Sequence, residues 1–196
     1  MNELKIQFGN ELKSNEQAKR IEDLYQAIRD EANKELSELP NFPADGDSFL
    51  HSVNDRINKY LGEYVDRDDP HDRYVVEAIA AALVVECRVR DIPVTASEIC
   101  EFVNAVVGDL DVEKSRVMKR KREFDQLAGE WTQPPQPEVF VDRFADELDI
   151  HPKTRDEALS AIEDVEGDSS TSGTNPSITA AAALWVGARR SGEPIR

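Results

Sequence analysis

The sequence predicts an all-α protein made of two helical repeats, and two stretches indicate this. The first, residues 75–93, reads VVEAIAAALVVECRVRDIP, and ten of its first eleven residues are apolar. A helix that is apolar on every face must be surrounded by other helices, and this one is too short to span a bilayer. The second stretch, residues 176–194, reads PSITAAAALWVGARRSGEP and aligns with the first after a shift of 101 residues. We expect two copies of one unit, each built around its own alanine-rich helix.

The aligned positions share an alanine–leucine core, an arginine and a closing proline: Ala80–Leu83 with Ala181–Leu184, Arg88 with Arg189, and Pro93 with Pro194. Alanine-rich helices resemble one another by chance, whereas the aligned arginine and proline favour a duplication. A cation at a helix C-terminus stabilises the helix by about 0.3–1 kcal/mol. The two arginines therefore have either this structural role or a partner contact. Arg189, Arg190 and Arg196 form a small basic group.

Apolar periodicity and start and stop signals predict five helices before Trp131. They are residues 16–39, a helix carrying Phe49 to Leu61, residues 74–90, a helix from the Thr95–Glu98 capping box to Gly108, and residues 112–128. In the capping box, the threonine hydroxyl and the glutamate carboxylate satisfy backbone amides. We expect Gly108 to close its helix in a left-handed cap. Asp111 is the predicted cap of the fifth helix and Gly129 its stop.

A proline-rich stretch, TQPPQP at residues 132–137, cannot continue a helix and is the best boundary in the chain. The expected organisation is an N-terminal segment (1–15), a first repeat (16–130), a linker (131–138) and a second repeat (139–196). The second repeat has predicted helices at 139–148 and 155–166, a loop at 167–175, and then the alanine-rich helix. It is incomplete, because it stops after its third helix where the first repeat has five.

The net charge of −16, from 40 acidic and 24 basic residues, is spread along the chain. With nine lysines against fifteen arginines, it indicates either adaptation to molar salt or an ordinary acidic cytosolic protein. Such a charge also repels nucleic acid at low salt. The cysteines, Cys87 and Cys100, lie in helical patterns and form no CxxC pair, so we expect core residues rather than a disulfide. No signal peptide or membrane span is recognisable, and we expect a cytoplasmic protein.

Catalytic and metal-binding patterns are not recognisable in the sequence. It has no nucleophile elbow, phosphate loop or HExxH motif, so we expect neither an enzyme nor a bound cofactor or small-molecule substrate. The turn Asp66–Asp72 superficially resembles a calcium loop. His71 stands where such a loop needs glycine and Pro70 occupies a ligand position, so we expect no metal there.

A basic cluster lies in the predicted fifth helix, and its members are Lys114, Arg116, Lys119, Arg120, Lys121 and Arg122. At 100° per residue, Arg116 and Arg120 lie on one side of the apolar stripe and Lys114 and Lys121 on the other. Lys119 and Arg122 point away from it. The helix follows a short capped helix and a turn, which is the order of a helix-turn-helix. Either it contacts phosphates or a partner, or it is a solvated helix whose cations pair with the abundant carboxylates.

Three passages resemble the core of transcription initiation factor IIB, in particular archaeal TFB: AIAAALVVECRVRDIPVTASEICEFV (78–103), PEVFVDRFADELDIHPKTRDEALSAIED (137–164) and SITAAAALWVGARRSGEPI (177–195). The shared pattern is an Ala-Ala-Ala-Leu helix, a positively charged end, a proline and a Thr-x-x-Glu-Ile helix. The resemblance covers residues 18–196. It implies an all-α fold of two cyclin-box repeats that binds the TATA-box-binding protein and flanking promoter DNA.

The sequence departs from the family in two respects. It has no paired CxxC or CxxH ligands for the zinc ribbon that contacts RNA polymerase, and it ends before the helix-turn-helix of the second repeat. The resemblance thus does not extend to polymerase recruitment, and the leading hypothesis is a TFIIB-like protein that acts as a regulator or competitor. One alternative is a cyclin-box module that binds proteins and not DNA, and another is a helix-turn-helix regulator that uses only the first repeat.

Overall fold

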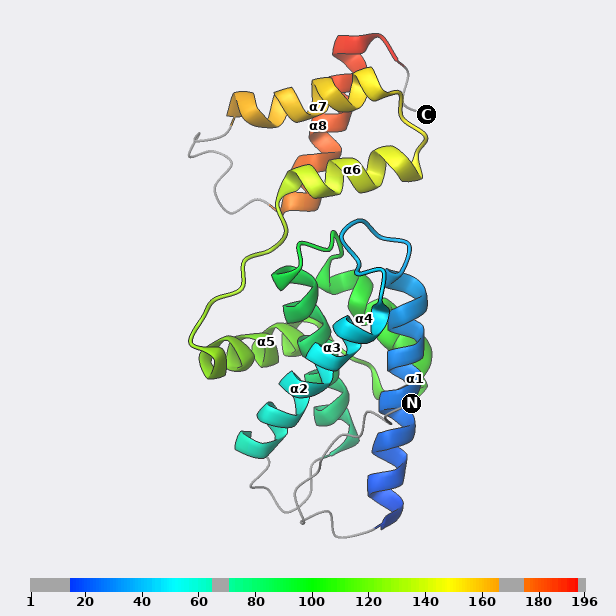
Figure 1. The fold of residues 1–196 in the computed structure, drawn as a ribbon, viewed down its shortest axis with the longest axis vertical. Coiled ribbons are helices and arrows are strands. Elements are labelled where there is room, and N and C mark those ends of the chain that lie inside the picture. Colours follow the sequence, from blue (N-terminus) through cyan, green and yellow to red (C-terminus); the bar gives the residue numbers. More distant parts are fainter. Residues whose placement is uncertain (1–14, 65–70, 166–174, 194–196) are drawn as a thin grey trace. The chain divides into compact units, whose positions relative to one another are not determined.

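The computed structural model describes residues 15–64, 71–165 and 175–193. Within these ranges the secondary structure is helical, with no β-strand (Figure 1). The helices are α1 (Asn15–Leu36), α2 (Gly46–Tyr64), α3 (Asp72–Val89), α4 (Ala96–Val107), the 3₁₀ turn η1 (Gly108–Leu110), α5 (Lys114–Ala128), α6 (Pro137–Glu147), α7 (Pro152–Val165) and α8 (Pro176–Ser191). The all-α prediction is confirmed. Most of the predicted N-terminal segment, of the 66–72 turn and of the 167–175 loop, together with Arg196, lies outside the described residues.

The chain divides into two compact units, and each contains one alanine-rich helix. Unit 1 comprises Met1–Glu38, Phe42–Arg90 and Thr95–Gln133, and holds α1 to α5. Unit 2 comprises Leu39–Asn41, Asp91–Val94 and Pro134–Arg196, and holds α6 to α8. The two alanine-rich helices, α3 and α8, thus lie in separate units. None of the described helices is both long enough and apolar enough to cross a membrane.

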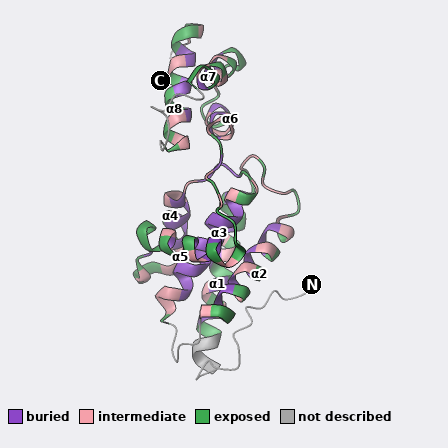
Figure 2. Ribbon diagram, turned by 90° about the vertical axis from the view of Figure 1, so that its left-hand side faces the viewer, coloured by how far each residue is buried: buried purple, intermediate pink, exposed green. Residues whose placement is uncertain are grey.

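In unit 1, α3 is the central helix. Every residue from Val75 to Cys87 is buried, and α3 packs against α1, α2, α4 and α5 (Figure 2). The buried run includes Glu86, whose carboxylate pairs with Arg56 of α2 at 2.8 Å and with Arg90 at 2.6 Å. The carboxylate is therefore neutralised inside the bundle, as a buried charge requires.

Local signals place α4 as predicted but not the start of α5. The capping box is present: Thr95 accepts from the Glu98 amide at 3.2 Å, and the Glu98 carboxylate accepts from the Thr95 amide at 2.7 Å. Gly108 is the C-cap of α4, as predicted, with a positive φ of 62°. Its ψ of −110° differs from that of the left-handed helical conformation, and the chain continues into η1. The prediction of Asp111 as the cap of α5 is wrong: Asp111 adopts a left-handed conformation, and Glu113 is the N-cap of α5. Gly129 ends α5 with φ 72° and ψ 12°, as predicted.

Unit 2 is a three-helix cluster in its described residues. Its buried core comprises Phe140, Val141, Ala145, Ala158, Ile162, Ala180, Ala183 and Leu184. The first helix, α6, starts at Pro137, inside the predicted linker, because proline is well suited to the first turn of a helix. Helices α7 and α8 approach closely at Gly187, where an added Cβ would lie 2.5 Å from the Thr154 carbonyl oxygen. Glycine is therefore needed there for packing.

Candidate nucleic-acid interface

Helix α5 is fixed on unit 1 by one buried face and by its entry turn. Val117 and Phe124 are buried, and the Phe124 ring stacks on Tyr60 of α2 at a centroid distance of 4.4 Å. At the N-terminal end, the side-chain amide of Asn104 donates to the backbone carbonyl of Val112 at 3.1 Å. It also accepts from the backbone N–H of Val112 at 2.7 Å. These contacts fix α5 against unit 1 and leave one of its faces exposed to solvent. The chain order α4, η1, α5 is that of a helix-turn-helix.

The predicted contact residue Lys121 lies inside the unit, with 5% of its surface exposed. Its ammonium donates to Asp125 at 2.6 Å and to the Thr132 carbonyl at 2.6 Å. Burial lowers the pKa of Lys121, and the hydrogen bond to Asp125 opposes that shift. Lys121 is therefore not part of the outward face. Periodicity placed it at the edge of the apolar stripe, and the carboxylate four residues later was the signal for an internal pair.

The Lys121–Asp125 pair also fixes the end of α5 and the residues that follow it. Asp125 accepts from the Thr132 hydroxyl at 2.9 Å and from its amide at 3.3 Å. Arg88, at the end of α3, donates to the Thr132 carbonyl at 3.2 Å. Burial lowers the pKa of Arg88, and the nearby Asp125 carboxylate opposes this. Arg88 thus has a structural contact within unit 1.

Two further predicted cations, Arg116 and Arg120, face a buried carboxylate on α3. Glu77 is 3% exposed and lies 3.7 Å from Arg116 and 3.5 Å from Arg120. Arg73 approaches the same carboxylate at 3.3 Å. Glu77 was visible in the sequence as the single charged residue in an apolar run. Its place opposite two arginines of α5 explains why a charge is tolerated there.

An aromatic and acidic cluster surrounds Arg120, and sequence reasoning missed it. The Arg120 guanidinium lies 4.0 Å from the Tyr74 ring centroid and 3.2 Å from Glu123. The Tyr60 hydroxyl lies 2.8 Å from the Tyr74 hydroxyl and donates to Glu123. Burial, with these hydrogen bonds, raises the pKa of Tyr60 well above its usual value. Arg120 is therefore largely committed to internal contacts, and no local sequence pattern links these distant tyrosines.

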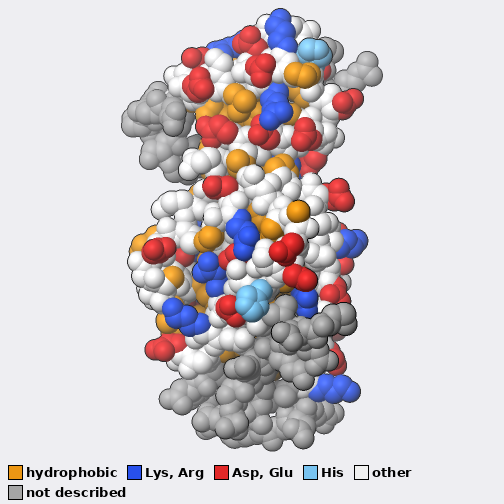
Figure 3. Space-filling view, in the orientation of Figure 1, with side chains coloured by type: hydrophobic (Ala, Val, Ile, Leu, Met, Phe, Trp, Pro, Cys, Tyr) orange, Lys and Arg blue, Asp and Glu red, His pale blue; other side chains and the backbone are white. Residues whose placement is uncertain are grey.

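Three predicted cations remain on the outward face of α5. Lys114, Lys119 and Arg122 are exposed, and no ion pair joins them to another residue in the described ranges. Lys119 and Arg122 are three residues apart, and Lys114 and Arg122 are eight apart, so the three share one side of the helix. Arg116 is at its margin, with 48% of its side chain exposed. We call Lys114, Lys119 and Arg122 the α5 basic face. On the side of the molecule seen in Figure 3, basic and acidic side chains are interspersed.

The remaining predicted residues, Arg189 and Arg190, belong to α8 of unit 2. Both are exposed. The Arg189 guanidinium lies 4.9 Å from the ring centroid of exposed Trp185. Arg190 pairs with Asp164 of α7 at 3.0 Å, with 41% and 58% of the two side chains exposed. Such an exposed pair contributes little to stability.

Comparison with known proteins connects this fold to transcription. Residues 131–196 match the family described as the transcription factor TFIIB repeat. Transcription initiation factor IIB 1 of Thermococcus kodakarensis is 29% identical over 165 residues, which cover 81% of this chain and 51% of that protein. Transcription initiation factor IIB of Pyrococcus horikoshii is 28% identical over 163 residues, with the same two coverages.

A further relative, transcription initiation factor IIB 1 of Thermoplasma volcanium, is 28% identical over 121 residues, 62% of this chain and 36% of that protein. The chain thus spans about half or less of the length of these relatives. A TFIIB repeat implies a cyclin-box helical repeat, in agreement with the predicted fold class. These relatives are initiation factors rather than enzymes. Residues 131–196 therefore match a TFIIB repeat, and the chain is similar over most of its length to archaeal transcription initiation factor IIB.

Proposed function

We propose that this chain binds the TATA-box-binding protein and promoter DNA, and that the α5 basic face contacts the DNA backbone. The observation that supports this most is the exposure of Lys114, Lys119 and Arg122 on a helix whose other cations are paired internally. In a chain of net charge −16, an exposed cationic face is the surface that attracts DNA phosphates most strongly. The similarity to transcription initiation factors supports a complex of this kind.

The test is a gel-shift titration on TATA-containing DNA, with and without the TATA-box-binding protein, from low to molar salt. The triple variant Lys114→Gln, Lys119→Gln, Arg122→Gln removes the face. A matched control, Lys19→Gln, Lys34→Gln, Lys153→Gln, removes the same charge from exposed positions on α1 and α7. Each lost phosphate contact lowers the salt slope by about 0.9, so we expect a decrease of about 2–3 for the first variant alone. Equal effects of the two variants would refute the assignment.

A second candidate is a cyclin-box module that binds proteins and not DNA. The internal pairing of Arg116, Arg120 and Lys121 favours it, because these cations are held by carboxylates of the same unit. If this is the function, the chain binds the TATA-box-binding protein but adds no DNA contact of its own in the same titration. The triple variant then leaves the complex with that protein intact. DNA binding without that protein supports the regulator that uses the first repeat alone.

The proposed role in regulation is competition at promoters. A chain that is similar to initiation factor IIB over 81% of its own length would occupy the same promoter sites as those factors. Added to a transcription reaction driven by a complete initiation factor IIB, this polypeptide should lower transcript yield in proportion to its occupancy of the promoter. An increase in yield would contradict competition.

A further inference from the structure

The outward side of α5 carries a row of hydrogen-bonding side chains directly opposite the buried stripe of the helix. This α5 polar row comprises Ser115, Lys119, Arg122 and Gln126, and all four residues are exposed. They are spaced by four, three and four residues, so at 100° per residue they fall within about 60° of one another. At 1.5 Å per residue the row is about 16 Å long. It shares Lys119 and Arg122 with the α5 basic face.

Carboxylates are absent from the row although 40 of the 196 residues are acidic. The carboxylates of α5 and its cap are paired within unit 1: Glu113 with Arg116, Glu123 with Arg120 and Asp125 with Lys121. The Ser115 hydroxyl donates to Glu113 at 3.4 Å and is therefore already engaged. Within the described ranges, Lys119, Arg122 and Gln126 make no hydrogen bond or ion pair through their side chains. These three are therefore available to a ligand.

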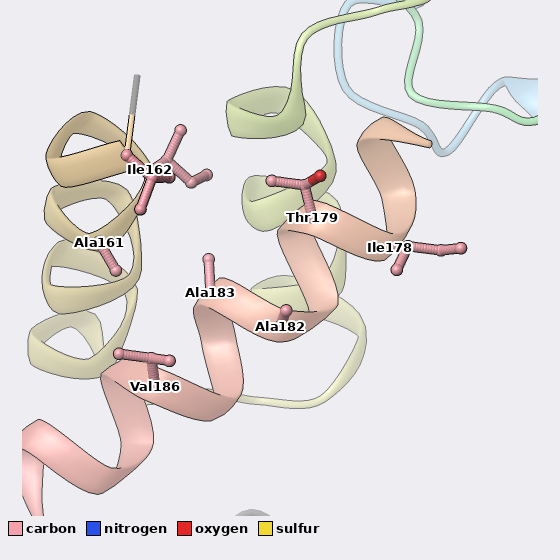
Figure 4. Close-up of a pocket in the computed structure, with 8 residues that line it drawn as sticks. Ala161, Ile162, Ile178, Thr179, Ala182, Ala183 and Val186 are labelled. Atoms are coloured by element: carbon pink, nitrogen blue, oxygen red, sulfur yellow. The ribbon is translucent and has the colours of Figure 1, made fainter. Parts of the chain in front are cut away.

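The polarity of the row indicates what kind of ligand fits it. The groove between α7 and α8 in unit 2 shows the contrast: it has a volume of about 270 Å³, and apolar Ile162, Ala183 and Val186 line it (Figure 4). Covering such a lining with a protein element removes apolar surface from water, which is favourable. Covering the α5 polar row with a protein helix would desolvate Lys119 and Arg122 without burying any apolar side chain of the row. A polyanion with its own hydrogen-bonding groups fits the row better.

We propose that Lys119, Arg122 and Gln126 contact base edges in the major groove of DNA, so that α5 selects a sequence as well as holding phosphates. This inference rests on the proposed DNA contact of the α5 basic face. The major groove of B-DNA admits an α-helix. Gln126 distinguishes base contact from phosphate contact, because its amide is uncharged yet matches adenine N6 and N7 with two hydrogen bonds. Arginine makes the equivalent pair with guanine O6 and N7.

The geometry of the row sets the expected spacing of the selected bases. The helix rises about 4.5 Å from Lys119 to Arg122 and about 6 Å from Arg122 to Gln126. Successive base pairs are about 3.4 Å apart, so each interval corresponds to one or two base pairs for a helix lying along the groove. We expect a guanine facing Arg122 and an adenine facing Gln126. Hydrogen bonds of Asn104 at one end of α5 and of Thr132 at the other hold the row in place.

The first test selects sequences from DNA with a fixed TATA box and randomised flanks, bound by the 196-residue chain with the TATA-box-binding protein. Selection with that protein alone gives the background. We expect the chain to add a preference of about fivefold or more for a guanine and a nearby adenine. Gln126→Ala should remove the adenine preference, and Arg122→Lys should weaken the guanine preference while keeping the charge. The control Gln133→Ala, at an exposed position outside α5, should change neither.

Two further measurements separate base contact from a structural effect. 7-Deazaadenine at the selected adenine removes N7 from the major groove and keeps Watson–Crick pairing. It should weaken binding of the wild-type chain about fivefold and leave binding of Gln126→Ala unchanged. The salt slope of Gln126→Ala should equal that of the wild type, because the replaced side chain carries no charge. Alanine is also favoured over glutamine in a helix, so the variant stays folded.

The outcomes distinguish this inference from the proposed function. Sequence preferences that Gln126→Ala leaves unchanged would overturn the base contact, as would a ternary complex in which the chain adds no preference. In both cases a lower salt slope after loss of the α5 basic face would still support phosphate contact. Absence of any DNA contact by the chain would refute both proposals.

Discussion

Replacing Gly187 with alanine should destabilise unit 2, although the same change usually stabilises a helix. Alanine is favoured over glycine in a helix interior by about 0.8–1 kcal/mol. At Gly187, however, the new Cβ would lie 2.5 Å from the Thr154 carbonyl oxygen and 2.8 Å from the Ala158 amide nitrogen, both backbone atoms of α7. These atoms move only if the whole helix moves.

The magnitude follows from that geometry. Real Cβ contacts do not fall below 3.0 Å, so α7 and α8 must separate by at least half an ångström along their closest contact. Overpacking of this kind costs about 1–3 kcal/mol or more. After the gain in helix propensity is subtracted, we expect a net destabilisation of up to about 2 kcal/mol.

The assay is thermal and urea unfolding followed by circular dichroism, with Gly62→Ala as the matched control. Gly62 lies inside α2, and a Cβ added there meets no atom within 4 Å. The control should therefore raise stability by up to about 1 kcal/mol, opposite in sign to Gly187→Ala. If both variants were stabilised equally, the close α7–α8 contact would be refuted.

Three further predictions concern the buried Glu77 carboxylate, the Thr95 helix cap and the Glu193 side-chain carboxylate. Glu77→Gln should cost about 2 kcal/mol in urea unfolding, below the 3–5 kcal/mol of a fully buried pair, because its arginine partners retain solvent access; an unchanged midpoint would contradict the pairing. Thr95→Ala should cost about 1 kcal/mol, whereas Thr95→Ser should retain most of the stability. The hydrogen bond from Thr154 lowers the pKa of Glu193. Its carboxylate therefore contributes stability above the unfolded-state pKa, near 4.3, and loses it as pH falls through the lower folded-state pKa. Wild type should be more stable than Glu193→Gln at neutral pH, and the difference should vanish in acid.

Much of the fold was predictable because its signals are local. The apolar run around Ala80 requires a buried helix, and the capping box at Thr95 needs only four consecutive residues. The start of α5 was not predictable, because the Asn104 side chain binds Val112 and holds η1 in the turn, a contact between two elements. The start of α6 at Pro137 was missed because proline breaks a helix interior but suits its first turn.

The candidate site was predictable as a helix but not residue by residue. Lys119 and Arg122 point away from the apolar stripe, and both are exposed in the structure. Lys121 and Arg120 lie beside the stripe, where periodicity does not distinguish a solvated cation from one paired inside. Only the fold brings Glu77 of α3 against Arg120. Site prediction therefore failed where a charge depends on a partner from a distant segment.

The most direct measurement is site-specific photocrosslinking from α5 to promoter DNA. A photoreactive residue is placed at position 119 on the α5 basic face, or at position 34 on α1 as a control, since both lysines are exposed. We predict crosslinks from position 119 to DNA flanking the TATA box when the TATA-box-binding protein is present, and none from position 34. A stable ternary complex that gave no DNA crosslink from position 119, or equal crosslinks from both positions, would contradict it.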